Sequence, residues 1–326
     1  PRRYSSAASD VYKRQPSVLS SLPSLCVGRA TSGHPCPVLS ILQLLVLATI
    51  RLASQSQGRN PSSGRRQTPL ETFIRYWVVG PPMRAPSMWG IAGSPIDHSI
   101  TPLLFQTIGK TLGVSSTETI RLEVKDAEEL LRYLSKTEGD IWLSCTSPIK
   151  HSLHSSIEDQ THPASSFNQI MKKDNLYKVA NTDGQGFILA CREMGLEPSK
   201  ASIMIRGGGS TARSVALEWS RSGGVIVPVG GRRELGNGPW TANTVSQNYA
   251  DLGVDFDASP GNSETSDMNV TTKVSVSYGN DWSVDDFAIR MVVAQHLLSW
   301  EVLYAPDLVN ALPSVSEVCA LLSHAD

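Results

Sequence analysis

A glycine-rich turn between an apolar strand and an amphipathic helix constrains the fold of this chain most strongly. Residues 201–205 predict a strand and residues 210–222 predict a helix, and the turn between them reads G-x-G-x-x-A. The first glycine of such a turn allows a tight bend, the second lets the backbone approach a pyrophosphate, and the small alanine lets helix and strand pack closely. The first amides of the helix attract phosphate charge. The sequence therefore predicts a dinucleotide site made by Gly207, Gly208, Gly209, Ser210, Thr211 and Ala212, with a glycine loop that binds no nucleotide as the alternative.

The next predicted strand bears on which dinucleotide would bind. Residues 224–229 run into Gly230-Gly231-Arg232-Arg233, with no acidic residue at the end of the strand. An NAD site usually carries an aspartate or glutamate there for the ribose hydroxyl. A guanidinium group instead suits a 2′-phosphate by charge and by its forked geometry. Arg232 and Arg233 thus favour NADP, unless they only cover a solvated turn.

Strands and helices alternate over the preceding part of the chain. Helical spacing is clear in residues 102–112 and 126–134, and Asp126 is a good N-cap for the second of these helices. Alternation of this kind predicts an α/β fold with a largely parallel sheet. The predicted strands are residues 89–93, 119–124 and 141–145.

Residues 1–87 differ from the rest in being rich in Ser, Pro, Arg and Gln and poor in acidic residues. We expect them to be an extension that is disordered or not native to the protein, with Met88 as the native start. The apolar run at residues 38–50 is too short for a membrane span, which needs roughly 20 apolar residues. A targeting segment is the alternative interpretation of this run.

The charge balance and the cysteines exclude several classes of function. With 29 basic and 30 acidic residues the net charge is −1, which gives no reason to expect a nucleic-acid partner. The 5 cysteines are scattered and form no C-x-x-C pair, so neither a disulfide framework nor a metal site is predicted. We expect a cytoplasmic protein with reduced thiols.

Three stretches each offer polar groups at the end of an apolar strand, where the sites of α/β proteins form. Lys150 could donate a proton to a ketone oxygen, Asp183 could pair with it, and the hydroxyls of Ser99 and Thr101 could bind a carboxylate. Taken singly, each of these residues could equally be an ordinary solvated residue of a turn. The three stretches are residues 93–102, 146–150 and 181–187.

Taken together and in this order, the three stretches and the glycine loop resemble the shikimate dehydrogenase family. Its corresponding stretches read N-P-I-x-H-S-x-S-P, N-V-T-x-P-x-K and D-N-T-D-G-x-G. The resemblance runs from about Met88 to the C-terminus. It implies a substrate-binding domain over residues 88–184, a Rossmann-like NADP-binding domain over residues 185–285, and helices over residues 286–326 that return to the first domain.

The resemblance also assigns roles to individual residues. It makes Lys150 the catalytic residue with Asp183 as its partner. It implies NADPH-dependent, reversible reduction of 3-dehydroshikimate to shikimate in chorismate and aromatic amino acid biosynthesis, by a monomer or homodimer. The remaining implied contacts are Ser99 and Thr101 to the substrate carboxylate, Thr146, Asn168 and Gln295 to the substrate, and Met291 to the nicotinamide.

The chain departs from the family pattern mainly on the cofactor side. Ser144 replaces an asparagine, residues 257–261 keep only a remnant of an N-A-T-S run, and residues 287–291 lose both glycines of a D-G-x-G-M-L run. Two alternatives follow from these departures. One is a protein that binds shikimate-like acids without turnover, and the other is a quinate/shikimate dehydrogenase.

Overall fold

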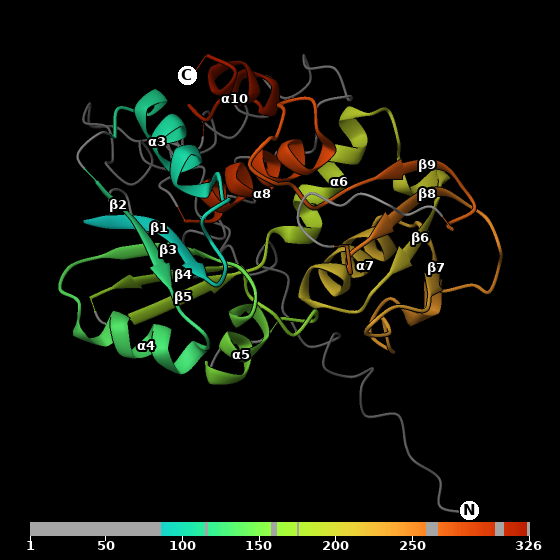
Figure 1. Ribbon diagram of the computed structural model, residues 1–326, viewed down its shortest axis with the longest axis horizontal. Helices are drawn as coiled ribbons and strands as arrows, with labels where there is room; N and C mark the ends of the chain where they lie inside the picture. Colours follow the sequence, from blue (N-terminus) through green and yellow to red (C-terminus); the bar gives the residue numbers. More distant parts are fainter. Residues whose placement is uncertain are drawn as a thin grey trace, which may run out of the picture. The chain divides into compact units, whose positions relative to one another are not determined.

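The computed structural model describes residues 86–114, 117–157, 162–174, 176–258, 267–303 and 310–324. These residues form two β-sheets with helices packed on them (Figure 1). The predicted extension lies outside the described residues except for its last two positions, and so does the apolar run at residues 38–50. Among the helices that are described, none has the length and apolar character needed to cross a membrane.

The first sheet has five strands in the order β2-β1-β3-β4-β5. β1 is parallel to β2 and β3, whereas β4 is antiparallel to both β3 and β5. Two reversals leave β5 running in the direction of β1 and β3, so the carboxyl ends of these three strands share one edge with the start of β4. The strands are β1 (Met88–Gly93), β2 (Glu118–Glu123), β3 (Ile141–Cys145), β4 (Gln169–Lys173) and β5 (Leu176–Ala180).

Because successive side chains of a strand point to opposite faces, the two faces of this sheet pack into two separate hydrophobic cores. Trp142 packs with Trp89, Phe105 and Trp300 on one face, and the rings of Phe105 and Trp142 have centroids 4.7 Å apart. Its neighbour Leu143 packs into the cluster on the other face. The first face is covered by α3 (Thr101–Thr111), α8 (Phe287–Leu303) and α10 (Val315–Leu322), the second by α4 (Ala127–Lys136) and α5 (Ile149–Ser156) (Figure 1).

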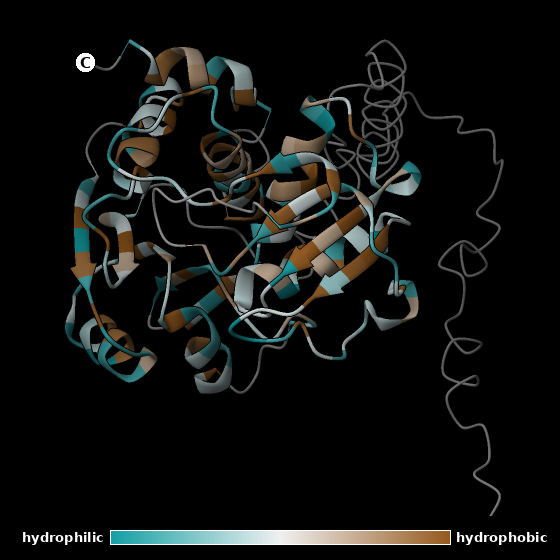
Figure 2. Cartoon of the chain, turned by 45° about the vertical axis from the view of Figure 1, so that its right-hand side comes forward, coloured by the Kyte–Doolittle hydropathy of each residue, from teal (hydrophilic) through white to brown (hydrophobic). Residues whose placement is uncertain are grey.

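The second sheet is parallel throughout, in the order β7-β6-β8-β9. Its apolar strands, brown in Figure 2, pack one face against α6 (Asp183–Glu193) and α7 (Ser210–Arg221). β7 lies on one side of β6 and β8 lies on the other, so the strand order reverses at β6. In α/β proteins ligands bind at the carboxyl ends of the strands at such a switch point. The strands are β6 (Ser202–Arg206), β7 (Val225–Val229), β8 (Ala250–Asp255) and β9 (Val270–Val274).

The predicted α/β class is confirmed, and the glycine turn lies between β6 and α7 as expected. Several elements were not predicted, namely α5, β4, β5, β8 and β9, and the β3-β4-β5 part makes the first sheet mixed. Helix α6 begins at Asp183, so the domain boundary expected after residue 184 falls in its first turn. Between β7 and β8 the chain forms only the short 3-10 segment η2 (Thr241–Asn243).

Candidate functional site

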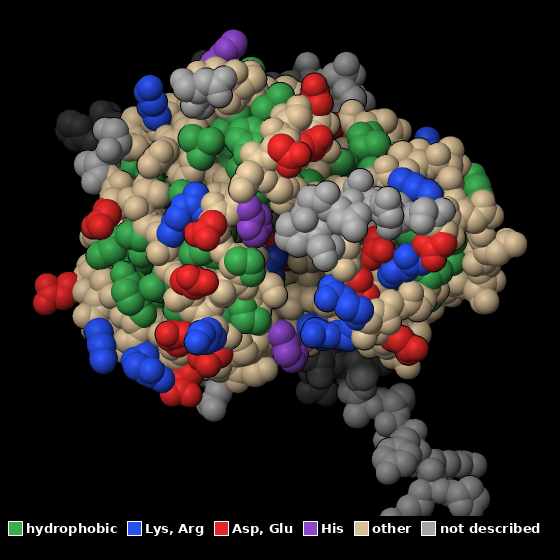
Figure 3. All heavy atoms as spheres, in the orientation of Figure 1, with side chains coloured by type: hydrophobic (Ala, Val, Ile, Leu, Met, Phe, Trp, Pro, Cys, Tyr) green, Lys and Arg blue, Asp and Glu red, His purple; other side chains and the backbone are tan. Residues whose placement is uncertain are grey.

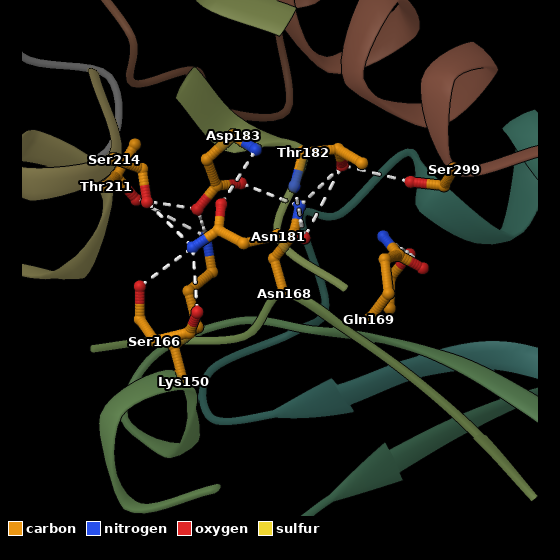
Figure 4. A network of polar contacts seen from close by, with 11 residues as sticks. Lys150, Ser166, Asn168, Gln169, Asn181, Thr182, Asp183, Thr211, Ser214 and Ser299 are labelled. Atoms are coloured by element: carbon orange, nitrogen blue, oxygen red, sulfur yellow. Dashed lines mark hydrogen bonds and ion pairs between the residues drawn. The ribbon is translucent and has the colours of Figure 1, made fainter. Parts of the chain in front are cut away.

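A lysine and an aspartate form an ion pair at the carboxyl edge of the first sheet. Lys150 lies in the first turn of α5, which follows β3, and Asp183 is the first residue of α6, which follows β5. Lys150 Nζ donates to Asp183 Oδ2 at 2.6 Å, with side-chain exposures of 14% and 1% (Figure 4). Burial from water strengthens such a pair when its other polar atoms are also satisfied.

The second oxygen of the carboxylate is held by an amide. Asn168, immediately before β4, donates from Nδ2 to Asp183 Oδ1 at 2.8 Å and to Thr182 Oγ1 at 3.0 Å. Its own Oδ1 accepts from the Thr182 backbone N–H at 2.9 Å. Asp183 is the first residue of α6, where the positive end of the helix dipole stabilises its carboxylate. Both carboxylate oxygens are therefore paired, which fixes the orientation that Asp183 presents to Lys150.

The network extends into two further helices. Asn181 donates to Ser166 Oγ at 2.9 Å and to Ser214 Oγ on α7 at 2.7 Å. The Thr182 and Ser299 hydroxyls lie 3.0 Å apart, which ties the segment to α8 (Figure 4). The segment that carries Asp183 is therefore held by hydrogen bonds to α7, which packs on the second sheet, and to α8, which packs on the first.

The two predicted carboxylate-binding hydroxyls follow β1 at the same edge. Ser99 and Thr101 are both buried, and the Thr101 backbone N–H donates to Ser99 Oγ at 3.3 Å. Arg121 on β2 donates from Nη1 to the Ile96 carbonyl at 2.7 Å and from Nη2 to the Ser99 carbonyl at 2.9 Å. A guanidinium group thus holds this loop and places positive charge behind it.

A tyrosine that sequence reasoning missed lies at the same loop. The Tyr278 hydroxyl accepts from the Ile100 backbone N–H at 3.5 Å. Burial raises the pKa of Tyr278, while a hydrogen bond with Ser99 and the charge of Arg121 act in the opposite direction. Tyr278 lies in the run after β9, far from Ser99 in the sequence, and only its placement among small polar residues could have drawn attention to it.

Two more predicted substrate residues lie near this edge. Thr146 directly follows β3, and its methyl group packs closely against Gly93. Gln295 lies on α8 against α6, where a Cβ on Gly186 would stand 2.5 Å from the Gln295 Cβ. The glycine at 186 is therefore what allows α6 and α8 to approach so closely.

The glycine loop combines a tight turn at its first glycine with open space at its third. Gly207 has a φ of +95°, a left-handed conformation that favours glycine. A Cβ on Gly209 would meet nothing within 4 Å, so space is open there, whereas a Cβ on Gly208 would stand 1.8 Å from the Glu234 carbonyl oxygen. Ala212 is fully buried at the contact of α7 with the sheet. Ser210 begins α7, and the Thr211 hydroxyl lies 3.3 Å from Lys150 Nζ.

The predicted phosphate-binding arginines differ from each other. The Arg232 backbone N–H donates to Asp257 Oδ2 at 2.5 Å, and its Nη2 donates to the Asp257 carbonyl at 3.0 Å. Arg233 is exposed and forms no ion pair within the described part of the chain. Met291, predicted at the nicotinamide, is 4% exposed and packs in the core with α6 and the second sheet, which leaves it little surface for a cofactor.

The arrangement can support proton transfer from Lys150 beside the glycine loop. Within the described ranges no group of His, Cys, Asp and Glu is arranged to hold a metal ion. Burial raises the pKa of Cys145, which precedes Thr146, to about 12, so this thiol stays neutral. Figure 3 shows basic and acidic side chains interspersed over one face of the molecule, in keeping with the net charge of −1.

Curated proteins named shikimate dehydrogenase (NADP(+)) are similar in sequence to this chain. The shikimate dehydrogenase (NADP(+)) of Rubrobacter xylanophilus is 30% identical over 143 residues, which cover 42% of this chain and 50% of that protein. The enzyme of the same name from Syntrophomonas wolfei is 30% identical over 134 residues, 40% of this chain and 46% of that protein. The chain thus matches about half the length of these curated relatives. No family model matches the chain.

Comparison with solved structures shows the same fold. Shikimate dehydrogenase 1 from Peptoclostridium difficile has a TM-score of 0.54 at 14% identity, covering 74% of this chain and 97% of that one. Shikimate 5-dehydrogenase from Thermus thermophilus, in complex with NADP(H) and shikimate, has a TM-score of 0.52 at 20% identity, covering 73% and 99%. The predicted resemblance is therefore present both in sequence and in fold.

Proposed function

We propose that the chain from about Met88 onward is a shikimate dehydrogenase that uses NADPH to reduce 3-dehydroshikimate reversibly to shikimate. One observation carries this proposal: the 2.6 Å pair of Lys150 and Asp183 lies next to the Thr211 hydroxyl of the glycine loop. A proton donor and a dinucleotide loop are thereby placed side by side. The matched relatives bear the same enzyme name.

NADP is the cofactor that the second sheet fits. The open space at Gly209 allows a pyrophosphate to approach the backbone, and the buried Ala212 lets α7 begin close to β6. No acidic residue stands at the end of β7, where an NAD site usually carries one. When bound, NADPH supplies the hydride that the reduction requires.

Lys150 holds the proton that the substrate's keto oxygen receives. Its Nζ donates this proton as negative charge develops on the oxygen, and takes it back in the reverse reaction. Asp183 orients the ammonium group and keeps it in place, while Asn168 fixes Asp183 from the other side. The low exposure of both members of the ion pair limits competition from water.

The other end of the substrate would lie at the Ser99 loop. The hydroxyls of Ser99 and Thr101 hold the carboxylate, and Tyr278 and the charge of Arg121 reinforce this anion site. Thr146, Asn168 and Gln295 then meet the ring hydroxyls from three different elements. Quinate carries an additional hydroxyl on the carbon that bears the carboxylate, so the Ser99 loop would decide between the two acids.

We further infer a cytoplasmic enzyme that acts as a monomer or homodimer. The three cysteines among the described residues, Cys145, Cys191 and Cys319, are free and buried, which fits a reducing compartment. A binding protein without turnover is not favoured, because the ion pair and the open glycine loop are both retained.

The test is the change in nicotinamide absorbance when the full chain is mixed with shikimate and NADP. Lys150→Ala should lower kcat about a thousandfold, since general acid catalysis contributes on that scale. The same change at the exposed Lys136 of α4 serves as the control and should leave kcat within about twofold. Thermal stabilisation by shikimate without turnover on NADP or NAD would instead support the binding protein.

A further inference from the structure

An aspartate stands at the switch point of the second sheet, where a dinucleotide would bind. Asp257 follows β8, and its backbone N–H donates to Asp255 Oδ1 at 2.8 Å. Its carboxylate lies against two glycines: a Cβ on Gly207 would stand 2.9 Å from Oδ1, and a Cβ on Gly231 would stand 2.4 Å from Oδ2. The carboxylate therefore occupies the space between the ends of β6 and β7.

This carboxylate holds one of the two arginines that follow β7. The Arg232 backbone N–H donates to Asp257 Oδ2 at 2.5 Å, and Nη2 donates to the Asp257 backbone carbonyl at 3.0 Å. The guanidinium meets the carboxylate itself through Nε, which lies 3.7 Å from Oδ1. The Asp257 side chain is 16% exposed, and the Arg232 side chain is 77% exposed. The bond from the Arg232 backbone N–H fixes the carboxylate, and Asp257 holds the guanidinium through its carbonyl oxygen and its carboxylate charge.

Two other arginines near the glycine loop have no such carboxylate. Arg213 lies in the second half-turn of α7, and its Nε is buried with no hydrogen-bond partner in the described structure. Arg233 precedes Glu234, whose carbonyl packs on Gly208. Burial lowers the pKa of Arg213, and the charge of Arg233 lowers it further, as expected for two cations that lie near each other.

We propose that Asp257 is a specificity-determining residue of the nucleotide site: it withholds Arg232 from the 2′-phosphate of NADPH and leaves Arg213 and Arg233 to bind it. This inference rests on the proposed function. A fixed carboxylate also repels a phosphate, so it acts against NADPH twice, by occupying a cation and by its own charge. The Asp257 carboxylate therefore lowers the ratio of NADPH affinity to NADH affinity.

The test measures the ratio of NADPH to NADH affinity by nicotinamide fluorescence titration of the full chain. Asp257→Asn keeps the shape of the side chain and removes its charge, and we expect the ratio to rise about tenfold. Asp267→Asn is the matched control, because that exposed carboxylate pairs with Arg206 instead of Arg232. It should leave the ratio within about twofold.

Arginine variants separate the roles of the three cations. Arg213→Ala and Arg233→Ala should each lower the ratio about tenfold, whereas Arg232→Ala should change it less than about twofold. In the Asp257→Asn background, Arg232→Ala should remove the part of the gain that comes from the released guanidinium and leave the part that comes from the lost carboxylate charge. A selective NADPH loss in the single Arg232→Ala variant as large as that of the other two would overturn the inference.

The failure of this inference can be told from failure of the proposed function. If the unchanged chain binds both nucleotides and oxidises shikimate but Asp257→Asn leaves the ratio unaltered, the role of Asp257 is wrong and the enzyme assignment stands. If neither nucleotide binds, both are wrong. 2′,5′-ADP, which carries the phosphate without the nicotinamide, should follow NADPH through the whole series of variants.

Discussion

The hydroxyl of Thr211 lies 3.3 Å from the carboxylate of Asp183, so the glycine loop is hydrogen-bonded directly to the ion pair of the first sheet. The same hydroxyl lies 3.3 Å from Lys150 Nζ. Thr211 therefore joins the loop that would hold the nucleotide to the group that would hold the proton (Figure 4). Thr211 is therefore placed to couple cofactor binding to the orientation of Lys150, if the loop holds the nucleotide as proposed.

Thr211→Val tests this coupling, because valine keeps the shape and removes the hydroxyl. We expect kcat to fall about tenfold, since a hydrogen bond to a charged group contributes on that scale, while the KM for shikimate changes little. Thr211→Ser restores the hydroxyl and should recover most of the activity. A Thr211→Val enzyme with the unchanged kcat would show that the contact is only structural.

Arg121 should act on substrate binding through the loop that it holds. Arg121→Gln removes the two hydrogen bonds to the Ile96 and Ser99 carbonyls and the charge behind the hydroxyls. We expect the KM for shikimate to rise about tenfold with kcat within about threefold, because the group touches neither the keto carbon nor the cofactor. Arg121→Lys should recover part of the affinity.

A matched control for Arg121 lies on α4. Arg132 pairs with Glu128 at 2.8 Å on an exposed helix face, so Arg132→Gln makes the same chemical change away from the site. Surface pairs of this kind contribute little, and steady-state kinetics should be unaltered. Equal effects of the two variants would argue against a positioning role for Arg121.

The buried His296 should make the fold sensitive to acid. Burial lowers the pKa of His296 from its ordinary 6.5 to about 3, and Trp300 donates to its Nδ1 at 3.2 Å. Above pH 6.5 the imidazole is neutral in both states and contributes no pH dependence. As the pH falls from about 6.5 towards about 3, only the unfolded chain takes up the proton, so the free energy of unfolding falls by about 1.4 kcal/mol per pH unit.

Denaturant unfolding between pH 7 and pH 4 measures this loss. His296→Leu should be less stable at pH 7 by about 1 kcal/mol, because the Trp300 N–H loses an acceptor, yet lose less stability on acidification than the unchanged chain. His324→Leu, at an exposed position after α10, is the control and should keep the original slope. An identical slope in all three proteins would exclude His296 as the source.

The sequence predicted features that depend on neighbouring residues, namely the strand, glycine turn and helix around residue 207, and it also predicted the pairing of Lys150 with Asp183. The glycine loop and the motifs around Lys150 and Asp183 are local, and their strand–turn–helix setting follows from short-range periodicity. Arg121, Tyr278 and Asp257 were not identified as site residues, because each gains its role from a partner that is distant in the sequence or on another strand. The strands β4 and β5 were missed because a hairpin with polar residues lacks the apolar run that marks a buried parallel strand.

Alanine substitutions at the two adjacent glycines Gly208 and Gly209 should have different effects, one on folding stability and the other on nucleotide binding. A Cβ on Gly208 would stand 1.8 Å from the Glu234 carbonyl, so Gly208→Ala should cost about 2 kcal/mol of stability by overpacking. A Cβ on Gly209 would meet nothing within 4 Å, and its φ of −69° suits alanine, so Gly209→Ala should fold with unchanged stability. The added methyl group would instead occupy space that the pyrophosphate needs.

Thermal unfolding without nucleotide and NADPH titration of the same samples separate the two effects. Gly209→Ala should keep its unfolding temperature and lose NADPH affinity by about a hundredfold or more, since a methyl group blocks the backbone approach. Gly208→Ala should unfold at a lower temperature, and NADPH should partly restore it by binding the folded state. Unaltered NADPH binding by a stable Gly209→Ala protein would mean that the open space at this glycine is not the pyrophosphate site.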